Sequence, residues 1–254
     1  MYLHNLNPVA IEIFGLKVYW YSLSYLFGFI FCLFFSKFLI KKKIINLNPH
    51  VIDNFFSWAV LGVILGGRLG YTSFYNFEFY LNNPIEVLKI WKGGMSFHGG
   101  LIGLIISMYT FSKIYKINFI NLSNLVACCA PVGIFFGRIA NFINAELIGK
   151  PTFSSWGVKY GDEDVLRHPS QLYEAFFEGL VIYIILMYVL KKDIYLKINL
   201  SSLFLIFYGL FRFIIEYYRE PDSHLGTIFY GLSMGQILSI PLIVFGFLIL
   251  RYGR

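Results

Sequence analysis

Residues 19–40 read YWYSLSYLFGFIFCLFFSKFLI, and Lys41-Lys42-Lys43 follow them directly. Most of these 22 residues are apolar, and about 20 such residues in an α-helix cross a hydrocarbon core of about 30 Å. No basic segment precedes the stretch, and lysines end it, so we expect an anchor that stays in place rather than a removable signal peptide. The stretch therefore predicts a membrane-spanning helix.

The rest of the chain has the same apolar character. Of its 254 residues, 57% are hydrophobic and 14% are charged, and the mean hydropathy is +0.66. This composition excludes an ordinary soluble domain. Further candidate spans are residues 55–75, 94–112, 119–142, 172–190, 200–217 and 231–250. We predict an all-α, polytopic protein with about seven transmembrane helices, forming a single integral membrane domain over residues 1–254.

The distribution of basic residues predicts the orientation, because short loops rich in Lys and Arg stay in the cytoplasm. With the N-terminus outside, the inner segments carry eleven Lys and Arg residues and the outer segments carry seven. We therefore expect the C-terminal Arg254 to be cytoplasmic. The longest non-membrane segment, at about 144–170, would form a small extracytoplasmic head that contains Asp162, Glu163 and Asp164. It is too short for its own core and should rest on the membrane helices.

Residues 137–150, GRIANFINAELIGK, bring Arg138, Asn141, Asn144 and Glu146 to the end of an apolar segment. In lipid such groups must pair inside the protein, line a cavity or reach the interface. One interpretation is a snorkelling Arg138 and a polar helix end that begins a loop. The density of polar side chains favours a functional site instead.

Three arginines, Arg68, Arg138 and Arg212, lie within or at the ends of the predicted spans. A guanidinium keeps its charge and offers a planar set of donors suited to phosphate or carboxylate, so the pattern indicates an anionic partner. The alternative is internal ion pairing. Glu216 lies four residues after Arg212 on the same helical face, and Glu146 lies eight residues after Arg138.

Residues 93–101, GGMSFHGGL, surround His98 with four glycines. A histidine there could accept a proton, since its ordinary pKa is about 6.5. Alternatively, His98 is structural and the glycines serve helix packing. Tyr208 shares a helical face with Arg212, although interfacial anchoring is the default for Tyr208 as for Tyr21. His168 precedes a helix start and is expected to be structural.

Other chemistries lack support in the sequence. Cys32, Cys128 and Cys129 lie inside apolar segments and suggest neither a disulfide framework nor a zinc motif. Serine-hydrolase, zincin and P-loop motifs are missing. The net charge of +7 is explained by loop placement rather than by a nucleic-acid partner. We expect no metal and no cofactor, and a membrane site with fixed cations that acts on a lipid phosphate ester.

These residues carry a family likeness that spans nearly the whole chain. The pattern Gly137-Arg138-x-Ala140-Asn141-Phe142-x-Asn144-x-Glu146-x-x-Gly149 resembles the signature of bacterial prolipoprotein diacylglyceryl transferases. Further blocks resemble that family's in the same order: His98-Gly99-Gly100-Leu101, Arg167-His168-Pro169-Ser170-Gln171-Leu172-Tyr173-Glu174, Tyr208-Gly209-x-x-Arg212-x-x-x-Glu216-x-x-Arg219-x-Pro221-Asp222 and Ser233-Met234-Gly235-Gln236. Ala140 stands where many members have glycine, and the head is short.

The resemblance implies transfer of the diacylglyceryl group of phosphatidylglycerol to the lipobox cysteine of a prolipoprotein, with release of glycerol 1-phosphate, in the bacterial cytoplasmic (inner) membrane. It implies that Arg138 and Arg212 act on the lipid phosphate and that His98 is the candidate base. The residues we assign to phosphatidylglycerol binding are Arg138, Asn141, Glu146, Gly149, Tyr21, Tyr208, Glu216, Arg68 and Arg219. An anion transporter or another lipid-phosphate transferase is the alternative, but the sequence shows no internal repeat of the kind many transporters have.

Overall fold

The structure is a computed structural model, and it describes residues 2–75, 77–161, 164–192, 198–221, 227–229 and 231–252. Several residues used in the sequence analysis lie outside the described residues: Asp162, Glu163, Asp222, Arg254 and Lys197, which is one of the eleven inner basic residues. Two compact units make up the chain. The first comprises Met1–Phe35 and Asn124–Arg254, and the second comprises Ser36–Ser123.

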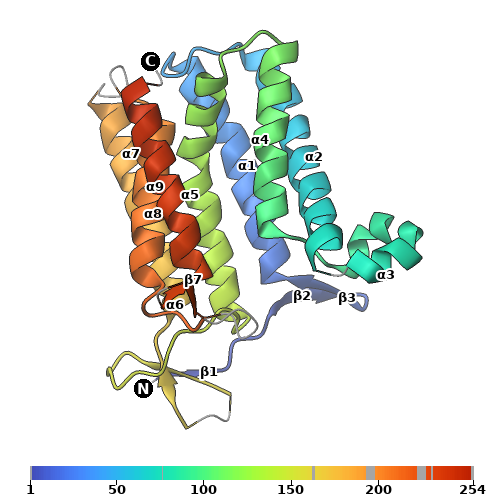
Figure 1. Ribbon diagram of the computed structural model, residues 1–254, viewed down its shortest axis with the longest axis vertical. Coiled ribbons are helices and arrows are strands. Elements are labelled where there is room, and N and C mark those ends of the chain that lie inside the picture. The colour runs from blue at the N-terminus through green and yellow to red at the C-terminus, as the bar shows by residue number, and fades with distance from the viewer. Residues whose placement is uncertain are drawn as a thin grey trace. The chain divides into compact units, whose positions relative to one another are not determined.

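Each of the seven predicted spans is helical in the structure (Figure 1). The long helices are α1 (Trp20–Lys41), α2 (Pro49–Phe74), α4 (Phe97–Ile114), α5 (Phe119–Ile143), α8 (Leu200–Ile215), α9 (Met234–Tyr252) and a continuous helix of α6 (Ser170–Glu174), η3 (Ala175–Val181) and α7 (Ile182–Lys191). Within the described part of the chain, five helices are long and apolar enough to cross a membrane: α1, α2, α5, Ser170–Lys191 and α9. The polytopic all-α class is confirmed, whereas the number of about seven spans stays a prediction, because α8 has only 16 residues and α4 is not among the five.

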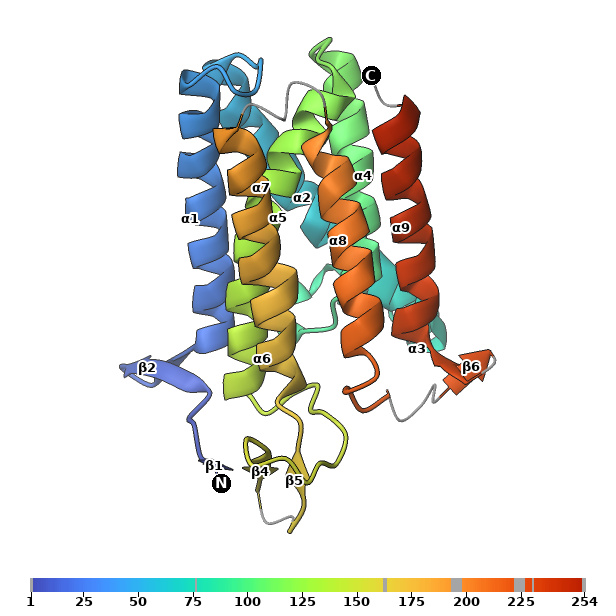
Figure 2. The same ribbon diagram turned by 90° about the vertical axis from the view of Figure 1, so that its left-hand side faces the viewer.

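In the first unit, the N-terminal part of α1 packs against α5. A Cβ placed on Gly28 would lie 3.4 Å from Gly133 Cα, and the rings of Phe27 and Phe136 are 5.6 Å apart. Helices α8 and α9 lie side by side (Figure 2), and Gly209 admits the side chain of Ile243 at their contact. Small residues thus let these helices approach closely.

A π-helical segment, η3, interrupts the helix that runs from Ser170 to Lys191. It contains Glu178 and Gly179, and a Cβ on Gly179 would lie 2.7 Å from Phe135 Cβ on α5. π-helical turns are frequent at functional sites. At this segment the helix packs closely against α5. The π-helical turn also rotates the side chains that follow Glu174 relative to their directions in a regular α-helix.

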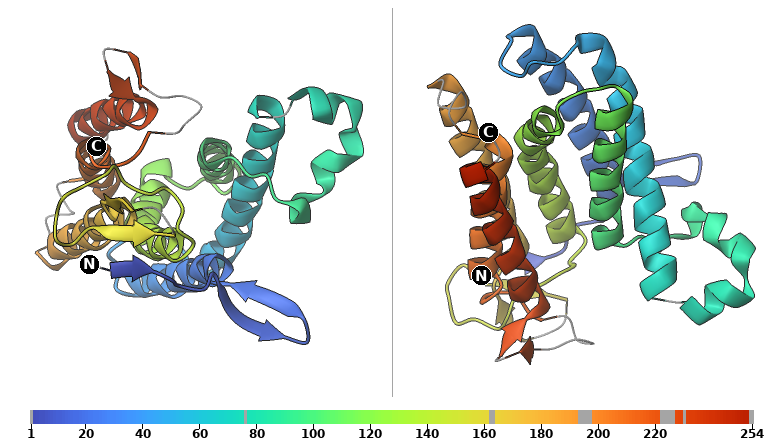
Figure 3. Two further views of the ribbon diagram at one scale, coloured as in Figure 1. Left: turned by 90° about the horizontal axis from the view of Figure 1, so that it is seen from below. Right: turned by 45° about the horizontal axis from the view of Figure 1, so that its top comes forward.

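The head contains a three-stranded sheet that the sequence analysis did not foresee. Strand β1 (Tyr2–His4) runs parallel to β4 (Val158–Tyr160), which is antiparallel to β5 (Leu166–Arg167) (Figure 3). Its small core consists of Phe142, Val158 and Tyr160 with Ile148 and Leu172 packed against them. Because Phe142 belongs to α5 and Leu172 to α6, the head packs on the ends of two helices. Two hairpins complete the strands: β2 (Val9–Ile13) with β3 (Leu16–Tyr19), and β6 (Thr227–Phe229) with β7 (Leu232–Ser233).

The second unit is built on the contact of α2 with α4, which lie side by side (Figure 1). A Cβ on Gly66 would lie 2.3 Å from Gly99 O, and one on Gly103 would lie 2.0 Å from Gly62 O. Glycines four residues apart on both helices therefore bring the two backbones together. Gly99 thus has the packing role that we considered as an alternative for the glycines near His98. The helix α3 (Phe77–Asn82) and the 3-10 turns η1 (Pro84–Leu88) and η2 (Ile90–Lys92) connect α2 to α4.

Candidate active site

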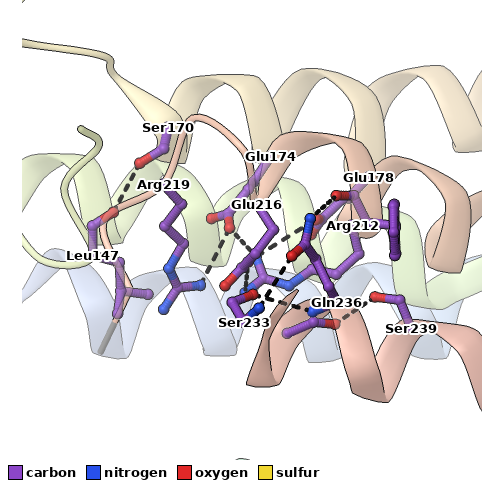
Figure 4. A network of polar contacts seen from close by, with 12 residues as sticks. Leu147, Ser170, Glu174, Glu178, Arg212, Glu216, Arg219, Ser233, Gln236 and Ser239 are labelled. Atoms are coloured by element: carbon purple, nitrogen blue, oxygen red, sulfur yellow. Dashed lines mark hydrogen bonds and ion pairs between the residues drawn. The ribbon is translucent and has the colours of Figure 1, made fainter. Parts of the chain in front are cut away.

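Six charged side chains of the first unit form one network, here called the arginine–glutamate cluster. Its members come from three helices and from the segment after α8: Arg138 on α5, Glu174 and Glu178 on the α6 and η3 parts of one continuous helix, Arg212 on α8, and Glu216 and Arg219 after α8. Figure 4 labels all of them except Arg138. The structure therefore brings together four residues that the sequence singled out, namely Arg138, Arg212, Glu216 and Arg219.

Glu174 is the centre of the cluster, because three arginines converge on its carboxylate. Arg138 Nη1 lies 3.2 Å from Oε2, Arg219 Nη1 lies 3.3 Å from Oε1, and Arg212 Nη1 donates to Oε1. Arg212 also reaches Glu216, with Nη2 2.8 Å from Oε2. The predicted pairing of Arg212 with Glu216 is confirmed, but the main partner of all three arginines is a different residue.

Glu178 lies one turn beyond Glu174 and is held more loosely. Its Oε2 is 3.5 Å from Arg138 Nη2, and its Oε1 is 3.8 Å from Arg212 Nη1. Both distances exceed those of charge-assisted hydrogen bonds, which are about 2.7–2.9 Å. Glu178 therefore contributes charge to the cluster but no close contact.

The cations and the carboxylates differ in accessibility. The side chains of Glu174 and Glu178 are 0% exposed, whereas those of Arg138 and Arg212 are 16% and 13% exposed. An approaching anion would therefore meet the guanidinium groups, with the carboxylates behind them. The carboxylates satisfy part of the arginine charge and fix the orientation of the donors, which is the kind of preorganisation that an anion site needs.

The loop after α5 is tied to the cluster through Gly149. Gly149 N donates to His168 O at 3.1 Å, and Lys150 N donates to Tyr218 O at 2.9 Å. A Cβ on Gly149 would lie 2.2 Å from His168 O and 2.8 Å from Tyr218 O. Because backbone crowds it on two sides, only glycine fits. The loop thus joins the chain entering α6 to the chain leaving α8.

Ser170 and Gln171 hold the same loop from the start of α6. Ser170 Oγ donates to Leu147 O at 2.9 Å, and Gln171 Nε2 donates to Glu146 O at 2.5 Å. Leu147 has a φ of 55°, an uncommon conformation for a residue with a side chain, so these bonds help to maintain it. Since Glu174 follows within the same helix, one segment positions both the loop and the central carboxylate.

Glu146 has different partners from those that we considered from the sequence. Asn141 Nδ2 donates to Glu146 Oε2 at 2.9 Å, and Asn144 Nδ2 donates to Oε1 at 3.3 Å. Arg138 pairs instead with Glu174 and Glu178. The reason is that α5 ends at Ile143 and the backbone then turns at positive φ, which takes Glu146 off the helical face that carries Arg138.

The block Ser233-Met234-Gly235-Gln236 begins α9 with a capping box. Ser233 N donates to Gln236 Oε1 at 3.1 Å, and Gln236 N donates to Ser233 Oγ at 3.3 Å. A Cβ on Gly235 would lie 2.6 Å from Glu216 Cδ. The glycine therefore admits the Glu216 carboxylate to the N-terminal end of α9, where the helix dipole favours a negative charge. Figure 4 shows Glu216 above Ser233 and Gln236.

The two tyrosines singled out by the sequence also belong to the first unit. Tyr21, in the first turn of α1, has its hydroxyl 3.2 Å from that of Tyr25 and is 37% exposed. Tyr208 lies on α8, one turn before Arg212, and its ring stacks on Phe204 with centroids 5.6 Å apart. Tyr208 therefore shares the helix that carries the most highly coordinated arginine of the cluster.

Arg68, in the second unit, has partners that leave no donor for a lipid phosphate. Its five N–H groups donate to backbone carbonyls between η1 and α4, at 2.5–3.3 Å: those of Glu86, Val87, Lys89, Gly93 and Gly94. Its guanidinium also lies over the Tyr80 ring, 5.2 Å from the centroid. Arg68 thus organises the connection from α2 to α4, which differs from the headgroup contact expected from the sequence.

His98 also belongs to the second unit. It lies at the N-terminal end of α4, where Ser96 caps the helix by accepting a hydrogen bond from Gly99 N at 3.2 Å. His98 is exposed, and its ring contacts that of Phe97 edge to face, with centroids 5.6 Å apart.

His168 lines a mostly apolar cavity of about 450 Å³ at the junction of head and helices. The cavity is lined by Trp156, His168, Tyr173, Phe177, Phe211, Ile214, Ile215 and Tyr218. His168 Nδ1 lies 3.1 Å from Tyr173 Oη, which also accepts a hydrogen bond from Trp156 Nε1 at 2.9 Å. Burial lowers the pKa of His168 below its ordinary value. These contacts agree with the structural role predicted for this residue.

The sequence analysis missed Glu178 and the central role of Glu174. The sequence did contain a signal for this pair, because two glutamates four residues apart inside an apolar span are expected to face a partner or a cavity. In the sequence analysis Glu174 appears only as the last residue of the block that begins at Arg167. Among the described residues, no group of three or more His, Cys, Asp or Glu side chains is arranged to hold a metal ion.

The fold and the cluster define a class: a multi-pass helical membrane protein with partly exposed arginines that buried glutamates hold in place. The sequence model of the family described as Prolipoprotein diacylglyceryl transferase matches residues 8–252. The chain belongs to this family and is a multi-pass bacterial membrane protein.

Three relatives illustrate the likeness. A protein of Rickettsia bellii (strain OSU 85-389) is 53% identical over 245 residues, covering 95% of this chain and 93% of its own length. Proteins of Rickettsia felis and Rickettsia typhi are each 49% identical, over 95% and 97% of this chain and 95% and 96% of their own lengths. All three are named phosphatidylglycerol–prolipoprotein diacylglyceryl transferase.

Proposed function

We propose that this chain transfers the diacylglyceryl group of phosphatidylglycerol to the lipobox cysteine of a prolipoprotein, forming a thioether and releasing glycerol 1-phosphate. The observation that carries the proposal is the arginine–glutamate cluster, in which Arg138 and Arg212 are partly exposed and Glu174 lies fully buried behind them. The names of the relatives support this choice of lipid and protein substrate.

The reaction needs the kind of site that the cluster provides. A bond from the thiol sulfur to an alkyl carbon of the lipid forms as the bond from that carbon to a phosphate oxygen breaks. The thiol loses its proton, and the phosphate leaves with a second negative charge. Guanidinium groups that are already oriented stabilise this developing charge without further reorganisation. We assign this role to Arg138 and Arg212.

The remaining members of the cluster position these two arginines. Glu174 and Glu216 fix the guanidinium of Arg212 from two sides. Arg219 approaches the same Glu174 oxygen as Arg212 and lies at the edge of the phosphate site. In this proposal Arg68 is left out of the phosphate site, because its donors are already engaged.

The loop after α5 and two tyrosines complete the headgroup site in this proposal. Asn141 and Glu146 present an amide and an exposed carboxylate that suit the hydroxyls of a glycerol headgroup. Gly149 contributes through the backbone position of the loop. Tyr21 and Tyr208 each interact electrostatically with Arg138, so both contribute a hydroxyl group to the site.

His98 is the proposed base for the thiol. A free thiol has a pKa of about 8.5, so a positioned base is worth roughly a hundredfold in rate near neutral pH. His98→Gln should lose most transfer at about pH 7 and recover part of it as the pH rises, while still binding phosphatidylglycerol. Wild-type rates at neutral pH in this variant would show that His98 is structural.

Transfer itself tests the proposed function. The purified protein in proteoliposomes receives phosphatidylglycerol with labelled acyl chains and a peptide that contains a lipobox cysteine. We expect the label on the peptide in a form that resists neutral hydroxylamine, which cleaves thioesters but leaves intact the thioether to the glyceryl group and the oxygen esters of its labelled acyl chains. A peptide with serine in place of the cysteine, and vesicles of phosphatidylethanolamine, are the controls. Unlabelled cysteine peptide in the presence of phosphatidylglycerol would refute the proposal.

We further propose that the protein lies in the cytoplasmic membrane as a single membrane domain, with the N-terminus and the head at about 144–170 outside and the C-terminus inside. The basic residues of the predicted loops support this orientation. Asp164 is exposed in the head, so Asp164→Cys should react with a membrane-impermeant thiol reagent on intact spheroplasts. Reaction only after permeabilisation would reverse the topology.

A further inference from the structure

Glu178 is the least well satisfied charge in the cluster. Its side chain is 0% exposed, and within the described part of the chain neither of its carboxylate oxygens has a hydrogen-bond partner. Its closest cations are Arg138 Nη2 at 3.5 Å and Arg212 Nη1 at 3.8 Å; Figure 4 labels Glu178 and Arg212. Buried polar groups are normally hydrogen-bonded, so each exception calls for an explanation.

Among the described residues, the cluster contains three arginines and three glutamates, so its charges cancel when all six side chains are ionised. The groups that act electrostatically on Glu178 come from its own helix, from α5, and from α8 and the segment after it: Glu174, Arg138, Arg212, Arg219 and Tyr208. A phosphodiester adds one fixed negative charge and has no proton to gain or lose near neutral pH. When the phosphodiester binds Arg138 and Arg212, the cluster would carry one uncompensated negative charge away from water. Such a buried charge is costly, and an ionisable side chain responds by becoming neutral.

We propose that Glu178 takes up one proton from the solvent when a phosphodiester headgroup binds to Arg138 and Arg212. The inference rests on the proposed function, since it requires a phosphate at these arginines. Glu174 keeps its charge because three arginines hold it, and Glu216 keeps its charge because Arg212 lies 2.8 Å away. Glu178 has only the two longer contacts, so it is the carboxylate that loses least on protonation.

Glu178 is thus a charge-balancing residue that acts through the two arginines. No covalent bond forms or breaks in this step, and the proton comes from water or buffer. Once it is neutral, the Glu178 carboxyl group no longer attracts the two guanidinium groups, so their positive charge acts on the phosphate instead. Binding of an anionic lipid headgroup is therefore linked to proton uptake, and its affinity falls as the pH rises through the range in which free Glu178 is ionised.

The test uses the full-length protein in detergent and dihexanoylphosphatidylglycerol below its critical micelle concentration. Titration calorimetry in buffers of different ionisation enthalpy measures the protons taken up per lipid bound. For the wild type we expect about one proton per lipid and a Kd that rises about tenfold per pH unit in that range. Glu178→Gln, which keeps shape but removes ionisation, should bind the lipid with no proton uptake and no such slope.

Two further variants identify the titrating group. Glu220→Gln removes a carboxylate that is 48% exposed and pairs with Arg167 outside the cluster, so it should behave as the wild type does. Proton uptake that persists in Glu178→Gln would overturn the assignment. If that uptake vanishes in Glu216→Gln, then Glu216 is the group that titrates instead.

If Glu178→Gln fails to fold, the measurement of proton uptake by the wild type alone still tests the inference. Binding of the lipid by the wild type with no proton uptake at any pH would overturn the inference while leaving the phosphate site of the proposed function in place. No binding at all would overturn both.

Discussion

Replacing the central carboxylate tests whether the cluster is a structural unit as well as a site. Glu174→Gln preserves the shape of the side chain but removes the charge on which Arg138, Arg212 and Arg219 converge. One of its two oxygens becomes an amide nitrogen, which donates and cannot accept, so at least one of the guanidinium groups loses its acceptor. Removing one partner of a buried ion pair costs about 3–5 kcal/mol. We expect the free energy of unfolding to fall by this amount.

Two matched variants should reduce the free energy of unfolding by smaller amounts. Glu216→Gln removes a carboxylate that pairs with one arginine and is 7% exposed, and losing a hydrogen bond to a charged group costs about 1.5–3 kcal/mol. Glu220→Gln removes an exposed partner of Arg167, and such surface pairs are worth up to about 1 kcal/mol. The predicted order of destabilisation is therefore Glu174, then Glu216, then Glu220.

The assay is thermal unfolding in one detergent, followed by tryptophan fluorescence. For a chain of this size 1 kcal/mol corresponds to about 2–4 °C in Tm, so Glu174→Gln should lower Tm by about 6–20 °C. A Tm for Glu174→Gln equal to that of Glu220→Gln would refute the reasoning, because it would mean that the three arginines do not depend on this carboxylate. Transfer by Glu174→Gln, measured well below its Tm, should also be strongly reduced.

Three other changes have clear expectations. Arg138→Lys keeps the charge but loses the planar set of donors, so kcat/KM for transfer should fall about a hundredfold or more; near-normal transfer would exclude a bidentate contact with the phosphate. Gly149→Ala places a Cβ 2.2 Å from His168 O and should cost about 1–3 kcal/mol in thermal unfolding, whereas Gly137→Ala, whose Cβ meets nothing within 4 Å, should not destabilise. Burial lowers the pKa of His168, so the unfolded chain binds this proton more readily and the residue's contribution to stability is lost as the pH falls below about 6.5. His168→Gln should therefore lose less Tm between pH 7 and pH 5 than the wild type, and an identical loss would contradict this.

Local conformation at the motifs was only partly predictable. A helix start after His168 was expected, and α6 begins at Ser170, because the proline signal at such a start acts over a few residues. The role of Gly149 was not predictable, since its need for glycine comes from His168 and Tyr218, which are distant in the sequence. The family motif marked the residue, and the packing supplies the reason for it.

The sequence by itself determined that this is a polytopic membrane protein and that its arginines matter. Both follow from single residues and their solvent, because a run such as residues 19–40 is stable only in lipid and a charge such as Arg138 needs a partner there. Only the tertiary structure decided which partner each arginine has. Glu174 lies 38 residues before Arg212 and 45 before Arg219, while Arg68 turns to backbone carbonyls of its own unit. Ion pairs form between groups that packing brings within about 4 Å, and helices whose apolar faces look alike in sequence do not reveal which of their polar residues will meet.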